Sequence, residues 1–386
     1  QRSAGFDMNS NRIFGLDFLR FMAIMLVVIG HGLNLMPSFP ELKSFFRVFD
    51  FIGVELFFVL SGFLIGTIFL KTFSIHSGTG DLIYFWKRRW WRTLPNYYLF
   101  VVINLIGFSL LKDDFRFDWR YLFFLQNVIS PHSGFFSVSW SLTVEEWFYL
   151  SVPLIFMIGL WIFKSKAFAI WSTVVLVVAA SLIARYQYIV NFDATWNNEI
   201  RQVALLRMDS LIYGVAAAWL WLNYNAFLTR YKIQLFVLGV CFMGAGIAIR
   251  NHPQLNQTQW MLMLLFPIIS LGVSFWLPIL ATWRSNIDKE GIMVKFVRNI
   301  SVWSYSLYLV HVPAMEGFRI FILPRTLDNA THQFFTFCLW IILTIFLSFL
   351  IYRFFEKPIM DLRDGVPDDG FIKAALKDRW SPKETK

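Results

Sequence analysis

Charged side chains are scarce in this sequence. Asp, Glu, Lys and Arg make up 16% of its 386 residues, whereas hydrophobic residues make up 57% and aromatic residues 19%. In a soluble domain of this size, about a quarter of the residues are charged. Such a domain could not bury apolar runs of this number and length. The composition therefore excludes a soluble globular protein and predicts an integral membrane protein.

Cysteine is scarce too, and several reactive motifs are missing. The two cysteines, Cys241 and Cys338, lie in apolar segments and form neither a disulfide framework nor a metal pattern. The histidines lack the spacing of a zinc site, so we expect no bound metal. There is no G-x-S-x-G segment and no G-x-x-x-x-G-K-[ST] phosphate loop. These absences argue against a serine hydrolase and against an NTP-driven pump.

What the sequence does contain is a long series of apolar runs, each about 20 residues, the length that spans hydrocarbon. Irregular backbone is not tolerated against lipid, so we predict an all-α fold, a polytopic membrane helix bundle of about ten transmembrane helices. We assign residues 1–358 to this transmembrane domain and residues 359–386 to a polar cytosolic tail. The predicted helices cover residues 14–36, 51–70, 94–111, 142–163, 167–184, 203–222, 233–249, 260–282, 300–321 and 334–354.

The distribution of Lys and Arg predicts the orientation. With a cytosolic N-terminus, most of these residues fall in cytosolic segments, as the positive-inside rule requires. An even number of helices then places both termini in the cytosol. Membrane topology also accounts for the net charge of +10, so we expect a lipid bilayer as partner and no nucleic acid.

Polar residues inside the first apolar run indicate function. Arg20 and His31 are separated by about three helical turns and therefore share one face, and Asp17 lies three residues before Arg20 on roughly the same face. Ionisable groups are costly in a membrane and mark functional sites by default. The alternative for each such residue is a structural pair inside the bundle.

The predicted topology brings further polar residues to a similar depth. It places them in a polar cavity open to the outer side, where a His beside carboxylates has the properties of a general base. We therefore predict His31, Glu145 and Glu146 as catalytic residues. The residues that converge on this layer are His31, Glu55, Glu145, Glu146, Arg207 and Asp209, whereas His311 is placed around the middle of its span or a little above it.

A basic cluster precedes the third predicted helix. It contains Arg88, Arg89 and Arg92, of which Arg89 and Arg92 share a helix face. Such a pair can hold phosphates by charge-assisted hydrogen bonds. The alternative is anchoring by positive charge, with tryptophans at the membrane interface. Arg20, which points into the bundle above this cluster, favours a path for an anion that leads towards His31.

Taken together, these motifs resemble the membrane acyltransferase-3 family of ten-helix O-acyltransferases. The segments occur in the family's order and are spread over the whole transmembrane region. They are GLDFLR at 15–20 followed by His31, GVELFFVLSGFLI at 53–65, RWWRTLP at 89–95, WSLTVEEWFY at 140–149, RMD at 207–209, SYSLYLVH at 304–311 and FEKP at 355–358.

The resemblance implies transfer of an acyl group from a CoA thioester to sugars, often in lipopolysaccharide, capsule, glucan or other glycolipids. It implies acetyl-CoA as cosubstrate, no permanently bound cofactor, and a location in a bacterial inner membrane. His31 is then the general base or acyl carrier, and Arg20, Arg88, Arg89 and Arg92 bind the donor. The remaining motif residues form a supporting polar core, namely Asp17, Glu55, Ser141, Arg207, Asp209 and His311.

Some family members carry an added hydrolase-like domain outside the membrane, and we expect no such domain in this chain. Two other functional classes remain open at this point. A transporter of an anion or a lipid-linked glycan would use a polar core of the same kind, with inverted repeats or broken helices. A non-catalytic receptor or scaffold would use it as a fixed polar network.

Overall fold

The chain folds into a bundle of α-helices, and the described residues contain no β-strand. The computed structural model describes residues 12–111, 113–131, 134–192, 194–285, 291–325 and 329–365. The predicted all-α class is confirmed.

The longer helices follow one another along the chain with short helical turns between them. Two of the turns, η3 and η8, are π-helical and the others are 3-10 helices. The elements are α1 Phe14–Gly32, η1 Leu33–Leu35, α2 Pro40–Thr72, α3 Thr79–Leu111, η2 Trp119–Phe123, α4 Ser139–Phe163, α5 Lys166–Asn191, η3 Trp196–Ile200, η4 Ala204–Leu206, α6 Met208–Asn223, α7 Asn225–Arg230, α8 Lys232–Arg250, η5 Leu255–Gln257, α9 Gln259–Thr282, α10 Ile292–Phe321, η7 Leu323–Arg325, α11 Ala330–Ile351, η8 Tyr352–Glu356 and α12 Lys357–Gly365.

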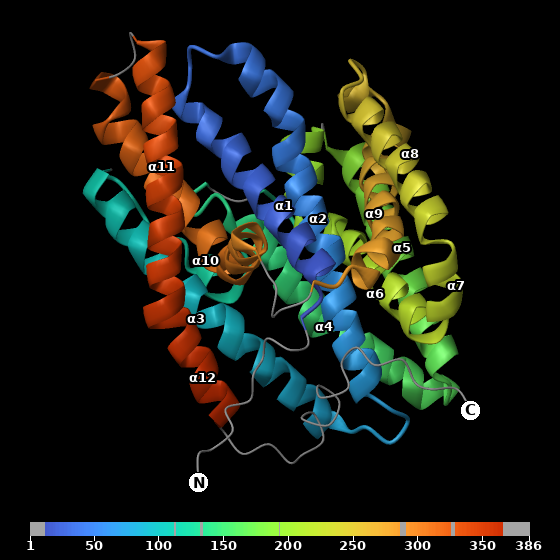
Figure 1. The fold of residues 1–386 in the computed structure, drawn as a ribbon. Coiled ribbons are helices and arrows are strands. Elements are labelled where there is room, and N and C mark those ends of the chain that lie inside the picture. The colour runs from blue at the N-terminus through green and yellow to red at the C-terminus, as the bar shows by residue number, and fades with distance from the viewer. Residues whose placement is uncertain are drawn as a thin grey trace.

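Helices α1 and α2 run through the middle of the bundle, with α11 and α12 on one side and α7 and α8 on the other (Figure 1). Helix α2 packs closely on α6 at two glycines. A Cβ atom on Gly62 would lie 1.9 Å from the backbone oxygen of Leu211, and one on Gly214 would lie 2.0 Å from that of Val59. Small residues let membrane helices approach this closely, and the contact sets the position of α6 against α2.

Eight helical spans among the described residues are long and apolar enough to cross a membrane. Two of the ten predicted spans are not among them. Helix α6 has only 16 residues, because the predicted span at 203–222 begins with the short turn η4. Helix α10 has 30 residues, and its predicted span at 300–321 has a lower hydropathy because it contains polar residues such as Ser304, Ser306 and His311. The count of ten and the cytosolic placement of both termini stay predictions.

Several helices begin earlier than predicted. Helix α3 starts at Thr79, whereas the predicted span starts at residue 94. The basic cluster of Arg88, Arg89 and Arg92 therefore lies on the helix itself and not in a loop before it. Helix α2 likewise starts at Pro40, and proline suits this first position because its missing N–H has no partner there.

The last helix continues beyond the predicted transmembrane domain. Helix α11 passes through η8 into α12, which ends at Gly365, whereas the predicted domain boundary lies at residue 358. The rest of the predicted tail, 366–386, lies outside the described residues.

Candidate functional site

Two histidines from opposite ends of the chain meet inside the bundle. Nδ1 of His31, in the last turn of α1, lies 2.9 Å from Nε2 of His311 in α10. Their rings are nearly parallel, with an interplanar angle of 6° and centroids 5.1 Å apart. His311 is fully buried. The predicted catalytic histidine therefore has a second imidazole as its hydrogen-bond partner, and we call the two the histidine pair.

Polar side chains continue from His311 along the contact between α10 and α4. The hydroxyl of Tyr308 lies 2.6 Å from Oγ of Ser141 on α4, and it donates to the backbone oxygen of Val138 at 3.1 Å. One turn earlier on α10, Tyr305 donates to the backbone oxygen of Thr93 on α3, at 2.7 Å. Residues three apart share a helix face, so one polar stripe of α10 faces α3 and α4. We call it the polar seam.

The seam ends at a cluster around Glu145. Oε2 of Glu145 accepts from Arg89 at 3.5 Å and from the Tyr149 hydroxyl at 2.7 Å, and Oε1 accepts from Ser61 at 3.4 Å. The guanidinium of Arg89 lies over the Tyr149 ring, 4.0 Å from its centroid. We call Ser61, Arg89, Glu145 and Tyr149 the arginine cluster. It joins helices α2, α3 and α4.

The predicted catalytic carboxylates thus have partners on the arginine side of the seam. Glu145 bonds within the arginine cluster, and the neighbouring Glu146 is buried and bonds to the side chain of Thr93. Glu145 lies one turn from Ser141 on α4, a rise of about 6 Å. The ring of His31 is instead hydrogen-bonded to His311, and the catalytic roles of Glu145 and Glu146 stay predictions.

The other predicted donor-binding arginines lie on the same side of the bundle. Arg88 donates to the Tyr84 hydroxyl at 3.2 Å, and Arg92 is exposed. The charge of Arg92 acts on Glu356, a buried carboxylate that accepts from Asn96 at 2.9 Å and from Ser306 at 2.6 Å. Glu356 belongs to the FEKP segment, and its contacts fix the end of η8 against α3 and α10.

Arg20 and Asp17 lie at the other end of α1 from His31. Their charged groups are 3.8 Å apart, which confirms the shared helix face that their spacing predicts. Asp17 also accepts from Arg12 and from the Ser301 hydroxyl at 2.8 Å. Asp17 therefore joins the start of α1 to α10.

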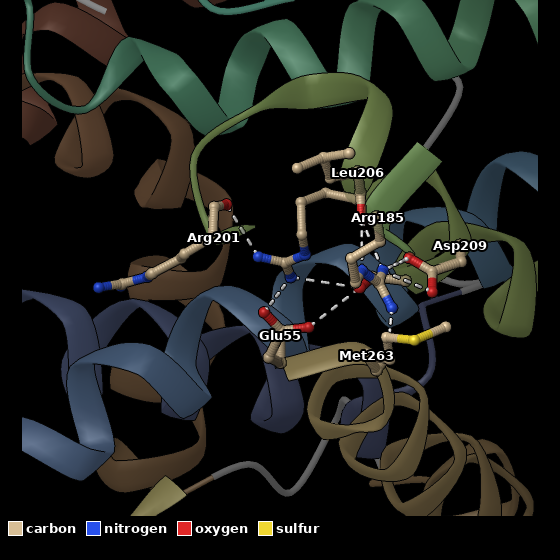
Figure 2. A network of polar contacts seen from close by, with 8 residues as sticks. Glu55, Arg185, Arg201, Leu206, Asp209 and Met263 are labelled. Atoms are coloured by element: carbon tan, nitrogen blue, oxygen red, sulfur yellow. Dashed lines mark hydrogen bonds and ion pairs between the residues drawn. The ribbon is translucent and has the colours of Figure 1, made fainter. Parts of the chain in front are cut away.

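A fully buried ion network lies between α2, α5 and α6 (Figure 2). Arg207 donates to Glu55, and Ser210 connects to both, at 3.2 Å in each case. Arg185 makes a bidentate contact with Asp209, at 2.9 and 2.8 Å. Two cations and two carboxylates balance here, so each buried charge has the partner that its burial requires.

The network also holds the chain segment before α6. Arg185 donates to the backbone oxygens of Leu206 and Met263, and Arg207 donates to that of Arg201 at 2.9 Å. The carbonyls of Leu206 and Arg201 lie in a stretch that has no continuous helix to pair them. The carbonyl of Met263 lies in α9, where Pro267 four residues on has no N–H to donate to it. Glu55, Arg207 and Asp209 thus stabilise the irregular segment between α5 and α6.

Arg201 carries a positive charge towards the histidine pair. Its side chain extends away from Glu55 and the ion network (Figure 2). The guanidinium lies among three aromatic rings, 5.8 Å from the centroid of Phe51, 5.4 Å from that of Trp140 and 5.9 Å from that of Trp196. Its charge acts on His31. A cation enclosed by aromatic rings therefore lies near enough to His31 for its charge to act on that imidazole.

Comparison with known proteins shows the family to which this chain belongs. The family profile described as an acyltransferase domain, that of acyltransferase-3, matches residues 13–353. The chain belongs to the acyltransferase-3 family. This confirms the resemblance drawn from the motifs, and with eight apolar spans it indicates a multi-pass membrane protein. No solved structure matches the chain.

This acyltransferase-3 chain is similar to curated relatives from Staphylococcus aureus. It is 26% identical over 371 residues to O-acetyltransferase OatA of strain NCTC 8325 / PS 47, covering 89% of this chain and 57% of the relative. OatA of strain COL gives the same values. The chain therefore spans little more than half the length of the curated relatives it matches.

Two site residues of this acyltransferase escaped the sequence analysis. Arg185 falls one residue beyond the predicted helix at 167–184, although α5 continues to Asn191. A longer window would have placed it inside an apolar helix. Arg201 carries no sequence signal, because its place beside the histidine pair depends on the irregular segment before α6. Among the described residues, no group of three or more His, Cys, Asp or Glu side chains could hold a metal ion.

Proposed function

We propose that this protein is a membrane O-acetyltransferase. It moves the acetyl group of acetyl-CoA, bound from the cytosolic side, to a hydroxyl of a cell-surface glycan or glycolipid on the outer side of a bacterial inner membrane. The observation that carries the proposal is the polar seam, which leads from the arginine cluster to the histidine pair between α3, α4 and α10.

The donor binds at the arginine end. Arg88, Arg89 and Arg92 lie on one helix and offer guanidinium groups to the phosphates of CoA, the type of contact that arginine makes best. Arg89 holds Glu145 at 3.5 Å, long for an ion pair, so exchange of the carboxylate for a phosphate costs little. The acyl-bearing arm then follows the seam past Tyr305 and Tyr308 to His31. Arg20, whose neighbour Asp17 contacts Ser301 of α10, is a further donor-binding residue in this proposal.

The acceptor binds at the opposite end, near Arg201. Aromatic side chains such as Trp140 and Trp196 suit the apolar faces of a sugar ring, and the guanidinium suits its hydroxyls. This end lies next to His31. Acceptor hydroxyl, base and thioester therefore meet at the histidine pair.

Two routes of transfer satisfy this arrangement. In the direct route, His31 removes the hydroxyl proton, the oxygen attacks the thioester carbonyl, the C–S bond breaks, and the proton passes to the departing CoA thiolate. In the second route, the imidazole attacks the thioester first, and the C–S bond breaks to release CoA thiolate. The acceptor hydroxyl then attacks the acetyl-histidine, the N–C bond breaks, and the hydroxyl proton passes to the thiolate. Simultaneous binding of a donor analogue and the acceptor would support the direct route. Isolation of a peptide with a labelled acetyl-histidine would support the second route.

The test is transfer of labelled acetyl from acetyl-CoA by the purified full-length protein, with a cell-envelope glycan extract as acceptor. We compare the wild type with His31→Ala and with His332→Ala, a control at an exposed histidine of α11. Label in glycan for the wild type and His332→Ala, and none for His31→Ala, supports the proposal. Equal transfer by His31→Ala overturns the role of His31. Passage of labelled glycan across proteoliposomes without CoA release would indicate a transporter instead.

A further inference from the structure

The hydrogen bonds around His311 determine which nitrogen of His31 is the basic one. We propose that His311 is a positioning residue that fixes His31 in the tautomer with its lone pair on Nε2. This inference rests on the proposed function only for its consequence in catalysis, because the tautomer itself can be measured without turnover.

The assignment begins at the backbone of α10. Nδ1 of His311 lies 3.3 Å from the carbonyl oxygen of Leu307, and the backbone of Tyr308 bonds to the same imidazole. A carbonyl oxygen accepts hydrogen bonds and cannot donate them. The hydrogen of a neutral His311 therefore lies on Nδ1, and its Nε2 carries a lone pair.

The same reasoning extends to His31. Nδ1 of His31 lies 2.9 Å from Nε2 of His311, and one of two nitrogens at this distance must donate to the other. Because Nε2 of His311 accepts, Nδ1 of His31 donates. A neutral His31 then has its lone pair on Nε2, the nitrogen on the far side of the ring from His311.

The surroundings favour the neutral state of His311. It is fully buried in α10, and the charges of His31 and Arg201 that act on the pair do not favour a second cation there. A second imidazolium facing His31 would leave both nitrogens of the contact as donors, with no acceptor between them. The histidine pair therefore holds at most one added proton, and that proton belongs on Nε2 of His31.

The contact between the two rings suits a His31 that first accepts a proton and then donates it. The rings are within 6° of parallel and meet at their nitrogen edges, so the N–H of His31 points along the lone pair of His311. When His31 gains a proton at Nε2, its Nδ1–H becomes a charge-assisted donor to His311 and the bond strengthens. His311 thus orients His31 and stabilises its protonated form, as a carboxylate does for a catalytic histidine in other enzymes. It does so without adding a negative charge to the protein interior.

The kinetic test compares two substitutions at His311. His311→Gln keeps an acceptor oxygen near the position of Nε2, whereas His311→Leu removes it at similar size. We expect kcat of acetyl transfer to fall by about 10² or more in His311→Leu, the usual contribution of a positioned base, with the KM for acetyl-CoA unchanged. His311→Gln should recover a large part of kcat. Equal losses in both variants, or a wild-type kcat in His311→Leu, would overturn the proposal.

A second measurement does not depend on activity. Nitrogen-15 NMR of the wild-type protein labelled at histidine distinguishes a protonated ring nitrogen from a bare one, and His31→Ala assigns the signal. We expect His31 to show a protonated Nδ1 and a bare Nε2. The reverse pattern refutes the inference even if transfer is observed, whereas the expected pattern without transfer would leave the tautomer established and the proposed function wrong.

Discussion

Arg89 and Glu145 face each other between α3 and α4, with Nη2 of the arginine 3.5 Å from Oε2 of the carboxylate. Tyr149 contacts both, since its hydroxyl donates to Glu145 and its ring lies beneath the guanidinium. This places a cation at one end of the polar seam, and the histidine pair lies at the other end. The relationship links a motif of the third helix to one of the fourth, beside the arginines that we propose bind the donor.

The first prediction concerns this arginine. Arg89→Ala should raise the KM for acetyl-CoA by about 10- to 100-fold, because one charge-assisted hydrogen bond to a phosphate contributes about 1.5–3 kcal/mol. The KM for the acceptor should stay unchanged. Arg230→Ala, at an exposed arginine of α7, is the control. A donor KM that does not move, or that rises equally in the control, contradicts a donor site at Arg89.

The second prediction concerns the opposite end of the site. Arg201→Met keeps an unbranched side chain among Phe51, Trp140 and Trp196 but removes the charge. We expect the KM for the glycan acceptor to rise by about tenfold, the effect of losing about 1.4 kcal/mol of binding free energy, while the KM for acetyl-CoA is unchanged. Steady-state kinetics with each substrate varied in turn provide the measurement. Arg116→Met, in an exposed loop, should leave both constants as they are.

The third prediction separates structure from catalysis. Arg185→Met leaves the carboxylate of Asp209 buried without its bidentate partner. The free energy of unfolding should fall by about 3–5 kcal/mol, as for other broken buried pairs. The control is Arg319→Met, which breaks an exposed pair with Glu316 and should cost no more than about 1 kcal/mol. Thermal unfolding in one detergent would show the difference, and similar midpoints for both variants would contradict it.

The fourth prediction concerns helix packing. Gly62→Ala places a methyl group 1.9 Å from the backbone oxygen of Leu211, so α2 and α6 must separate. Overpacking of this kind costs about 1–3 kcal/mol or more, and the displacement also disturbs the contact of Glu55 with Arg207. Gly107→Ala, in α3, meets no atom within 4 Å and should be neutral or stabilising. Size-exclusion profiles and unfolding midpoints of the two variants provide the measurement. Equal midpoints and profiles for Gly62→Ala and Gly107→Ala would contradict the prediction.

Patterns within one helix were readable from the sequence. Apolar runs predict membrane helices because hydrocarbon accepts no unpaired backbone, and the spacing of Asp17 and Arg20 predicts their contact because the helical period is fixed. Helix ends were less certain. The start of α3 at Thr79 was missed because Lys87 and the arginines beside it interrupt the apolar run, although they do not interrupt the helix.

Contacts between helices depended on the tertiary structure. A hydrophobic period tells which face of a helix is buried, but it does not tell which helix covers that face. The pairing of His31 with His311 joins residues 280 positions apart, and the sequence placed carboxylates beside His31 on depth alone. The place of Arg201 depends on the irregular segment that Arg207 holds. The sequence by itself therefore determined the membrane class, the family and the candidate residues, whereas only packing in three dimensions decided which polar groups meet, because partners distant in sequence have no period to relate them.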